Sequence, residues 1–261
     1  MTILAQSIWQ GVAELGQVCL YFVELAKTFW RKKISGHEVL EQIWKVTVQS
    51  APTTALAGFF VGAIMTVQFT MQMKEFGALG FLGGLATSGT IREVGPLLIA
   101  FLLAGKIGAF TSAELGTMRV TEQLDAIRCL GADPVQEIIL PRFLGIVVAS
   151  FFLLGLGLVG SVFGGLLLGQ IFAGVNPQEY VRYIPDFVHG YSIFCGLFKC
   201  LTFSILLATV CTYYGYFASG GARGVGRAVV RTAVVTMIVI VVADWVTSYL
   251  TDAVLKMVGI L

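Results

Sequence analysis

The sequence predicts an all-α, polytopic membrane protein that forms a single domain over residues 1–261. Hydrophobic residues make up 57% of the chain, charged residues only 12%, and the mean hydropathy is +0.86. A soluble domain carries about 25% charged residues, so this chain has too few polar side chains to cover a water-facing surface. The 31 glycines favour close helix packing in lipid. The net charge of +2 is too small to indicate a nucleic-acid partner.

Residues 1–33 are expected to form an amphipathic helix that lies in the membrane interface rather than crossing the membrane. Apolar side chains such as Trp9, Phe22 and Trp30 cover most of its surface, while one stripe is polar, which is typical of interfacial helices. The segment is not a signal peptide, because it lacks a basic start and polar residues interrupt its apolar run. The polar stripe consists of Gln6, Gln10, Glu14, Gln17, Glu24 and Lys27.

Five apolar segments are long enough to cross a bilayer as helices, which requires about 20 residues each. The glycine-rich residues 77–91 between the first two are expected to form a broken or re-entrant segment. Residues 173–192 are expected to be a polar loop that could contain a short helix, and residues 218–231 are expected to be a loop. The predicted spans are residues 46–73, 93–117, 143–172, 193–217 and 232–250.

Glycines in the first and third spans recur at the spacing of a helix–helix contact. Gly58 and Gly62 are four residues apart, the small-x-x-x-small pattern of closely packed membrane helices. The third span contains a literal G-x-G-x-x-G, Gly155 to Gly160, but no strand precedes it, so a nucleotide site is a poor interpretation. Close packing is the better prediction for both segments.

A short charged helix is predicted over residues 121–131, between the second and third spans. Thr121 is a candidate N-cap, and Glu122 and Asp125 place negative charge at the positive end of the helix. Arg128 lies towards the other end, and Gly131 is a natural C-terminal stop.

The distribution of basic residues predicts that the N-terminus lies in the cytoplasm, because lysine and arginine are enriched in cytoplasmic segments. The outer segments then hold only Lys74, Arg92, Arg182 and Lys256. The cytoplasmic segments hold Arg31, Lys32, Lys33, Lys45, Arg119, Arg128, Arg142, Arg223, Arg227 and Arg231.

The chain shows no sign of being an enzyme by itself. Its two histidines, His37 and His189, fall in different loops, and no P-loop, H-E-x-x-H or G-x-S-x-G motif is present. The five cysteines include no C-x-x-C pair, so we expect neither a disulfide framework nor a metal site. No cofactor is expected in this chain, and any ATP is hydrolysed elsewhere.

Charged residues in and beside the second span are the strongest functional signal. Arg92 and Glu93 begin it, Lys106 lies at its middle and Glu114 near its end. Each such charge costs roughly 2.5–3.5 kcal/mol on insertion scales, so it usually faces protein or water and has a function. The structural alternatives are an inert Arg92–Glu93 pair at the headgroups, a Lys106 that snorkels and a Glu114 at the inner interface.

A polar patch shared by the first two spans is a hypothesis that follows from these positions. Gln68 and Gln72 lie on the outer half of the first span, at a depth similar to that of Glu93, with Phe69 and Phe76 nearby. Such a patch could receive the headgroup of an amphiphile while apolar walls receive its tails.

The run from Arg92 to Arg142 resembles the signature region of the MlaE family of ABC-transporter permeases. That family's patterns R-E-x-G-P, A-G-[RK]-x-G, A-E-[IL]-G-x-M-[RK]-x-x-E-Q-[IL]-x-A, D-P and P-R all occur here in order. They fall at Arg92–Pro96, Ala104–Gly108, Ala113–Ala126, Asp133-Pro134 and Pro141-Arg142.

The resemblance implies a homodimeric permease with a separate cytoplasmic ATPase, which would bind ATP and magnesium, and with MCE-domain proteins on the outer side. Together they would move phospholipid or a related lipid between the inner membrane and the outer envelope. Arg92 and Glu93 would lie near a central lipid cavity, with Gln68, Gln72, Phe69 and Phe76 in its wall. The short helix over residues 121–131 would be the coupling helix, seated in the ATPase, and would present Glu122, Gln123, Leu124, Asp125 and Arg128.

Two other function classes remain as alternatives. A secondary transporter or channel could use Glu93, Lys106 and Asp244 as an ion path, although no inverted repeat is evident. A structural scaffold for an MCE partner would not need a charged second span.

Overall fold

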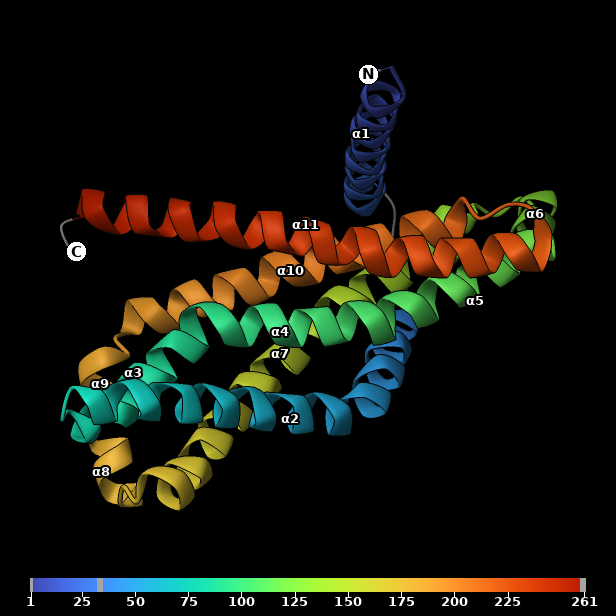
Figure 1. Cartoon of the computed structure of the whole chain (residues 1–261). Helices are drawn as coiled ribbons and strands as arrows, with labels where there is room; N and C mark the ends of the chain where they lie inside the picture. The colour runs from blue at the N-terminus through green and yellow to red at the C-terminus, as the bar shows by residue number, and fades with distance from the viewer. Residues whose placement is uncertain (1, 32–34, 259–261) are drawn as a thin grey trace.

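The structure is a computed structural model that describes residues 2–31 and 35–258, with side chains described for residues 13–30 and 35–257. Five helical segments are long and apolar enough to cross a membrane, which confirms the predicted fold class. Figure 1 shows them spanning the length of the molecule, with the third running obliquely to the others. The five segments are α2 (Gly36–Glu75), Leu79–Val120, Val135–Ala173, α10 (Gly190–Tyr216) and α11 (Gly221–Val258).

The second and third segments are each built from several helical pieces that follow one another without a loop. The second comprises a 3₁₀ turn (Leu79–Phe81), α3 (Leu82–Gly89), a π turn (Thr90–Val94), α4 (Gly95–Leu103), a second π turn (Ala104–Gly108) and α5 (Ala109–Val120). The third comprises a π turn (Val135–Ile139), α7 (Leu140–Leu168) and a further π turn (Gly169–Ala173). The short connecting helices are α6 (Gln123–Cys129), α8 (Pro177–Arg182) and α9 (Ile184–Phe187).

Helices α2 and α7 pack with their backbones in contact, and glycine makes this possible. A Cβ placed on Gly62 would lie 1.8 Å from the carbonyl oxygen of Ser161, and one on Gly58 would lie 2.1 Å from that of Gly157. From the other side, a Cβ on Gly164 would lie 1.9 Å from the Phe59 carbonyl oxygen. The predicted glycine contact is therefore confirmed, and part of the G-x-G-x-x-G run belongs to it.

The prediction of a broken segment over residues 77–91 was wrong. Only a tight turn at Gly77, where φ is +65°, separates α2 from the helix that starts at Leu79. The glycines that follow serve packing instead: a Cβ on Gly83 would lie 1.9 Å from the carbonyl oxygen of Tyr180 in α8. The second span therefore begins 14 residues earlier than its predicted start at residue 93.

Two further boundaries differ from the prediction. Residues 218–231 are not a loop, because α11 begins at Gly221, after a turn that Gly220 and Gly221 make with φ values of 91° and 67°. The predicted helix 121–131 is shorter, and Thr121 is not its N-cap. Glu122 precedes α6 in a left-handed conformation with φ of 61°, while Thr121 ends α5. Gly131 does end the turn as predicted, with φ of 83°.

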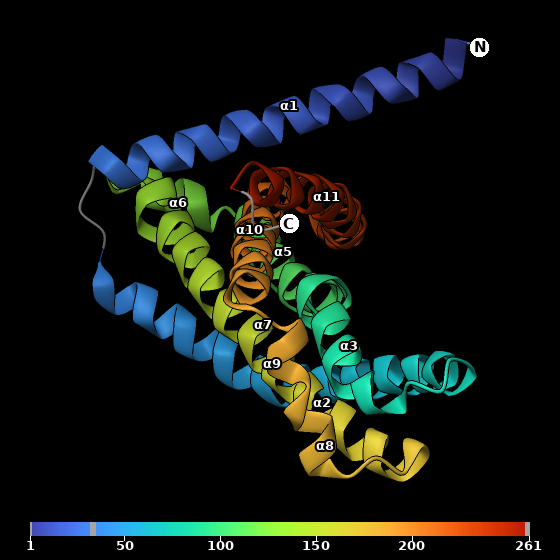
Figure 2. The same cartoon turned by 90° about the vertical axis from the view of Figure 1, so that its left-hand side faces the viewer.

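Helix α1 (Thr2–Arg31) lies across the five long helices rather than along them (Figure 2). It contacts the bundle through Val18, Tyr21 and Leu25, which are buried. This transverse position is the one expected of an interfacial helix. Lys32 and Lys33, which the charge analysis assigns to the cytoplasmic side, lie outside the described residues.

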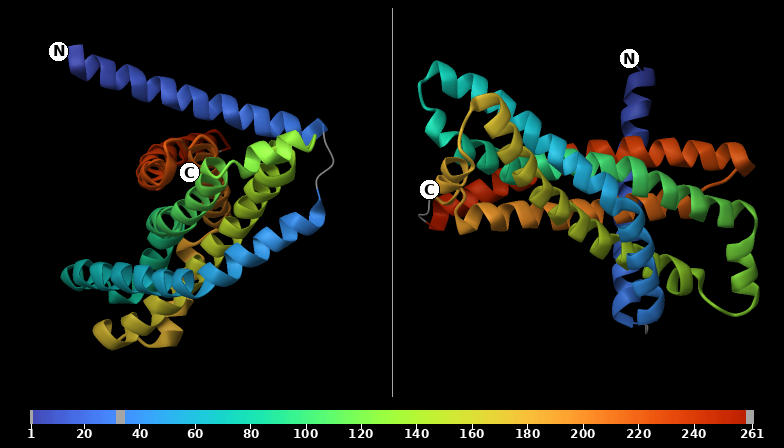
Figure 3. Two further views of the ribbon diagram at one scale, coloured as in Figure 1. Left: turned by 90° about the vertical axis from the view of Figure 1, so that its right-hand side faces the viewer. Right: turned by 90° about the horizontal axis from the view of Figure 1, so that it is seen from below.

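The two ends of the bundle differ in what they carry. Helix α6 lies at one end, beside the start of α11, whereas α3, α8 and α9 gather at the other end near the C-terminus (Figure 1). Helix α2 bends in its N-terminal half (Figure 3), and Pro52 inside it accounts for the bend, since proline removes a helical hydrogen bond. The α6 end and the α3–α8–α9 end are called the coupling end and the distal end below.

Candidate functional site

A buried lysine joins three helices in the distal half of the bundle. Lys199 on α10 has a side chain that is 1% exposed. Its Nζ lies 2.7 Å from Oε2 of Glu93, 2.8 Å from Oδ1 of Asp244 and 2.7 Å from Oγ of Ser248. Ser248 in turn donates to the Glu93 carboxylate at 3.2 Å. We call these four residues the lysine cluster; with one cation and two carboxylates, it carries a net charge of −1 when all groups are ionised.

Local backbone features bring these side chains together. Pro96 has no N–H to donate to the Arg92 carbonyl, and the π turn Thr90–Val94 ends two residues before it. Helix α10 approaches this turn closely because Gly196 has no side chain: a Cβ there would lie 2.7 Å from the Ile91 carbonyl oxygen. Lys199, one turn after Gly196, thereby reaches Glu93.

Arg92 extends this polar region towards the end of α11. Its guanidinium lies 3.3 Å from Oδ1 of Asp252 and 5.6 Å from the centre of the Tyr191 ring. The Arg92 side chain is 28% exposed and that of Glu93 48% exposed. Arg92 and Glu93 are therefore neither fully buried nor paired with each other; each has its own partner on α10 or α11.

Sequence reasoning identified Glu93 and Asp244 but missed Lys199 as the residue that joins them. The signal was present, because a lysine seven residues into an apolar span needs a carboxylate partner. Asp244 is the only aspartate within a predicted span, and it would have been the natural candidate.

The polar patch expected between the first two spans is not formed by hydrogen bonds among the described residues. Gln68 and Gln72 are exposed on α2, whereas Glu93 bonds to α10 and α11. Phe69 is partly buried against the distal core cluster of Leu82, Val175 and Tyr180. Phe76, at the end of α2, is 77% exposed.

Lys106 is bound to the bent part of α2. Its Nζ donates to the Gln49 carbonyl oxygen at 2.5 Å and to Oγ1 of Thr53 at 2.9 Å. Pro52 disturbs the hydrogen-bond ladder of α2 at this level. Lys106 therefore does not snorkel; its ammonium group supplies donors to the backbone where α2 bends.

Glu114 lies at the meeting point of α2, α5 and α7 near the coupling end. Its Oε1 lies 3.0 Å from Nζ of Lys45 and 3.5 Å from Nη2 of Arg142. The Arg142 side chain is only 9% exposed. Together with Lys106, this contact means that both inner charges of the second span face α2, on a different side from the lysine cluster.

Asp125 fixes the orientation of α6 against the bundle. It accepts from Arg119 at 2.8 Å and from Arg128 at 3.2 Å, and Arg128 also donates to the hydroxyl of Tyr216 at the end of α10. Leu124 is fully buried beneath the helix. Both the apolar and the ionic contacts of α6 thus hold it to its own chain.

The outward face of α6 carries the side chains that remain available to a partner. Glu122, Gln123 and Arg128 are exposed, and Leu130, just after the helix, is 86% exposed. Within the described part of the chain, no group of three or more His, Cys, Asp or Glu residues is placed to hold a metal ion.

Comparison with known proteins identifies the family to which the chain belongs. The Permease MlaE family model matches residues 39–250. The probable ABC transporter permease protein slr1045 of Synechocystis is 33% identical over 211 residues, which cover 81% of this chain and 78% of that protein.

Two relatives carry more specific names. The intermembrane phospholipid transport system permease protein MlaE of Haemophilus influenzae is 30% identical over 179 residues, covering 68% of this chain and 69% of that protein. The chloroplastic protein TRIGALACTOSYLDIACYLGLYCEROL 1 of Arabidopsis thaliana is 29% identical over 248 residues, covering 92% of this chain and 68% of that protein. This chain belongs to the MlaE family of ABC-transporter permeases, and it is the multi-pass, non-catalytic transport subunit that requires a separate ATPase.

Proposed function

We propose that this permease moves phospholipid or a related lipid between an inner membrane and an outer envelope, driven by ATP that the partner ATPase hydrolyses with magnesium. The name of the Haemophilus relative supports the lipid class. In this proposal two copies of the chain enclose a central lipid cavity, and an MCE-domain protein receives or delivers lipid at the distal end. The coupling end lies in the cytoplasm, as does the N-terminus.

The observation that carries the proposal is the continuous helical segment Leu79–Val120. It passes the lysine cluster at Glu93, contacts α2 through Lys106 and Glu114, and leads through a two-residue turn into α6. A displacement of α6 by an ATPase would therefore act directly on the segment that carries Glu93. If the lipid site and the ATPase contact lay on separate helices, no continuous segment would need to join Glu93 to α6.

The exposed groups around the lysine cluster fit a phospholipid headgroup. Arg92 can contact a phosphate, and the half-exposed Glu93 carboxylate can contact an amine or hydroxyl. The wall of the cavity would include Gln68 and Gln72, with Phe69 and Phe76 beside the acyl chains.

Helix α11 offers the surface for the second copy. Val234, Val241 and Trp245 are 50%, 50% and 71% exposed and recur at steps of seven and four residues, so they share one face of the helix. Tyr249 stacks on Trp245 with ring centres 6.2 Å apart and extends this face towards the distal end. We call this surface the free face of α11.

The proposal is tested by reconstituting the permease with its ATPase and measuring ATP-dependent lipid transfer between vesicles. Arg92→Gln and Glu93→Gln are expected to reduce transfer at least tenfold at normal protein levels. Lys27→Gln, an exposed charge on α1, is the matched control. Wild-type transfer rates in both Arg92 and Glu93 variants would contradict the lipid-site assignment.

Attachment of the ATPase is tested separately by co-purification. Glu122→Arg alters an exposed side chain and is expected to release the ATPase while leaving the permease folded. Asp125→Arg is expected to release it as well, because it also breaks the ion pairs that orient α6. Retention of the ATPase by both variants would exclude α6 as the coupling helix.

The alternative of a secondary transporter or channel is not supported. Membership of an ABC permease family overturns it, and the structure separates its proposed ion path. Lys106 lies 13 residues after Glu93, or about 20 Å along a helix at ~1.5 Å per residue, and it is bound to α2 rather than to the lysine cluster.

A further inference from the structure

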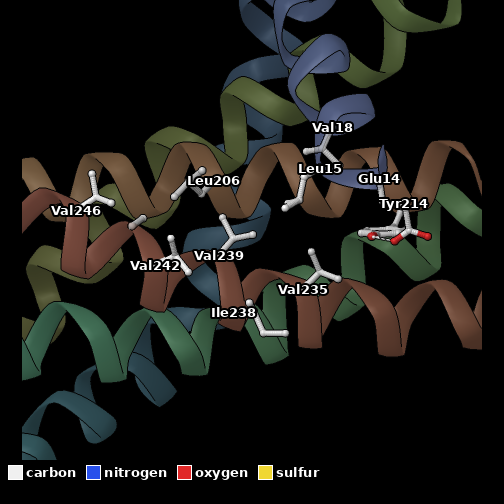
Figure 4. Close-up of a pocket in the computed structure, with 11 residues that line it drawn as sticks. Glu14, Leu15, Val18, Leu206, Tyr214, Val235, Ile238, Val239, Val242 and Val246 are labelled. Carbon is white, nitrogen blue, oxygen red and sulfur yellow. Dashed lines mark hydrogen bonds between the residues drawn. The ribbon is translucent and has the colours of Figure 1, made fainter. Parts of the chain in front are cut away.

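An apolar groove with a charged end lies where α1 crosses the bundle, away from the lysine cluster. Its volume is about 540 Å³, within the roughly 300–1,000 Å³ typical of small-molecule sites. Residues of α1, α10 and α11 line it (Figure 4). The lining residues are Glu14, Leu15 and Val18 of α1, Leu206 and Tyr214 of α10, and Val235, Ile238, Val239, Val242, Ala243 and Val246 of α11.

The polar groups of the groove gather at one end. Glu14 and Tyr214 lie together there, with the Tyr214 hydroxyl 3.4 Å from Oε2 of Glu14 (Figure 4). Arg231, one turn before Val235 on α11, reaches Oε1 of Glu14 at 3.2 Å. The side chains of Arg231 and Glu14 remain 63% and 41% exposed, so both charges are accessible to a ligand.

The rest of the groove is aliphatic and has a definite length. From Val235 to Val246 the groove follows α11 for 11 residues, or about 17 Å at ~1.5 Å per residue. One leaflet of a bilayer has a hydrocarbon depth of roughly 15 Å, half of the ~30 Å core. The groove has a charged end near the interfacial helix and an apolar length of one leaflet. It therefore has the dimensions to hold one acyl chain of a phospholipid, with the headgroup at the charged end.

Most of the groove lies on a different side of α11 from the surface proposed for the second copy of the chain. At about 100° per residue, Val235, Val239 and Val246 point roughly 100–140° away from Val234, the first residue of the free face. Ile238, roughly 40° from Val234, lies where the two surfaces adjoin. A dimer built on the free face would leave most of the groove on its flank, beside α1.

We infer that this groove binds a zwitterionic phospholipid of the leaflet at the coupling end, with an acyl chain along α11, its phosphate near Arg231 and its protonated amine near Glu14. The choice of headgroup follows from charge complementarity: the exposed end offers one cation and one carboxylate within 3.2 Å of each other. A purely anionic headgroup would satisfy Arg231 but would be repelled by Glu14. The site is independent of transport and lies apart from the proposed lipid cavity at Arg92.

The test uses the full-length permease in nanodiscs without ATP, so its outcome does not depend on the proposed transport function. Phosphatidylethanolamine and phosphatidylglycerol, each with a photoreactive diazirine on one acyl chain, are incorporated at equal low fractions. Labelled positions are then mapped by mass spectrometry. With the ethanolamine lipid we expect labelling at Val239 and Val246 several-fold above that at Val159 and Phe163, which face outward on α7.

Variants separate the acyl and headgroup contacts. Val239→Trp fills the groove and is expected to lower its labelling about tenfold, whereas Val159→Trp, the same change at an exposed site on α7, leaves groove labelling unchanged. Glu14→Gln is expected to abolish the preference for ethanolamine over glycerol headgroups.

Three results would overturn the inference. The first is equal labelling of the groove and of α7 in the wild-type protein, which needs no variant and means annular lipid only. The second is a groove that labels equally with both headgroups. The third is a cross-link from a photoreactive residue at position 239 to a second copy of the chain, which would mean that protein covers the groove.

Discussion

Replacing Lys199 by methionine tests how much the lysine cluster contributes to stability. Methionine keeps most of the side-chain length but removes the charge that lies within 2.8 Å of both carboxylates. The side chain of Asp244 is only 15% exposed, so its carboxylate would be left without its cation in an apolar environment. Removing one partner of a buried ion pair costs about 3–5 kcal/mol, a change of more than 100-fold in the unfolding equilibrium.

The contributions of the two carboxylates to this cost differ. Glu93 is 48% exposed and can be solvated by water or headgroups, so most of the loss is expected at Asp244. The double variant Lys199→Met with Asp244→Asn removes both charges and should recover roughly 0.5–3 kcal/mol, the usual coupling between residues in one network.

The assay is equilibrium unfolding of the purified permease in mixed micelles with increasing sodium dodecyl sulfate, followed by helical circular dichroism. Lys256→Met, an exposed lysine near the end of α11, is the matched control and should change the unfolding free energy by less than about 0.5 kcal/mol. A Lys199→Met protein within about 1 kcal/mol of the wild type would refute the reasoning, as would a double variant less stable than the single one.

Three other substitutions give separable outcomes. Gly62→Ala places a Cβ 1.8 Å from the Ser161 carbonyl oxygen. It should cost about 3 kcal/mol in the same unfolding assay, since overpacking costs roughly 1–3 kcal/mol. Gly105→Ala, whose new Cβ would have nothing within 4 Å, should be near neutral. Lys106→Met removes the hydrogen bonds to the Gln49 carbonyl and the Thr53 hydroxyl at the bend of α2 and should cost about 1–2 kcal/mol. Lys106→Arg should retain most of the stability; equal losses would argue against a donor role. Leu130→Asp changes a side chain that is 86% exposed, so the melting temperature should stay the same. The affinity for the ATPase, measured by titration, should fall about 30-fold if ~2 kcal/mol of contact energy is lost. An unchanged affinity would place the ATPase elsewhere.

The number and order of the helices could be predicted because apolar length and punctuation are local properties of the sequence. The short helix α6 was also predictable, since charges and Gly131 delimit it within a few residues. The structure of residues 77–91 was not, because the same glycines suit either a break or a close contact. Gly83 serves a contact with Tyr180, almost 100 residues later in the chain, which no local pattern reveals.

The candidate site was predictable only in part, for the same reason. Glu93 and Asp244 could be singled out individually, since charges are rare in the spans. Their connection through Lys199 depends on how α10 packs against the π turn before Pro96. Likewise, the positions of Lys106 and Glu114 indicated a function, but the partners of both residues on α2 depend on helix packing.

The two π turns in the second span set the direction in which the residues after them point around the helix axis. Each places one extra residue in a turn, so everything beyond it is rotated by about 100° relative to an uninterrupted α-helix. Deleting a single residue from Thr90–Val94 would rotate Lys106 by about 100° relative to α3, away from its contacts on α2, although Lys106 itself would not be mutated. An insertion in Ala104–Gly108 could restore the angle towards α6 but not that of the helix between the two turns. Residue count in this segment is thus as constrained as residue identity.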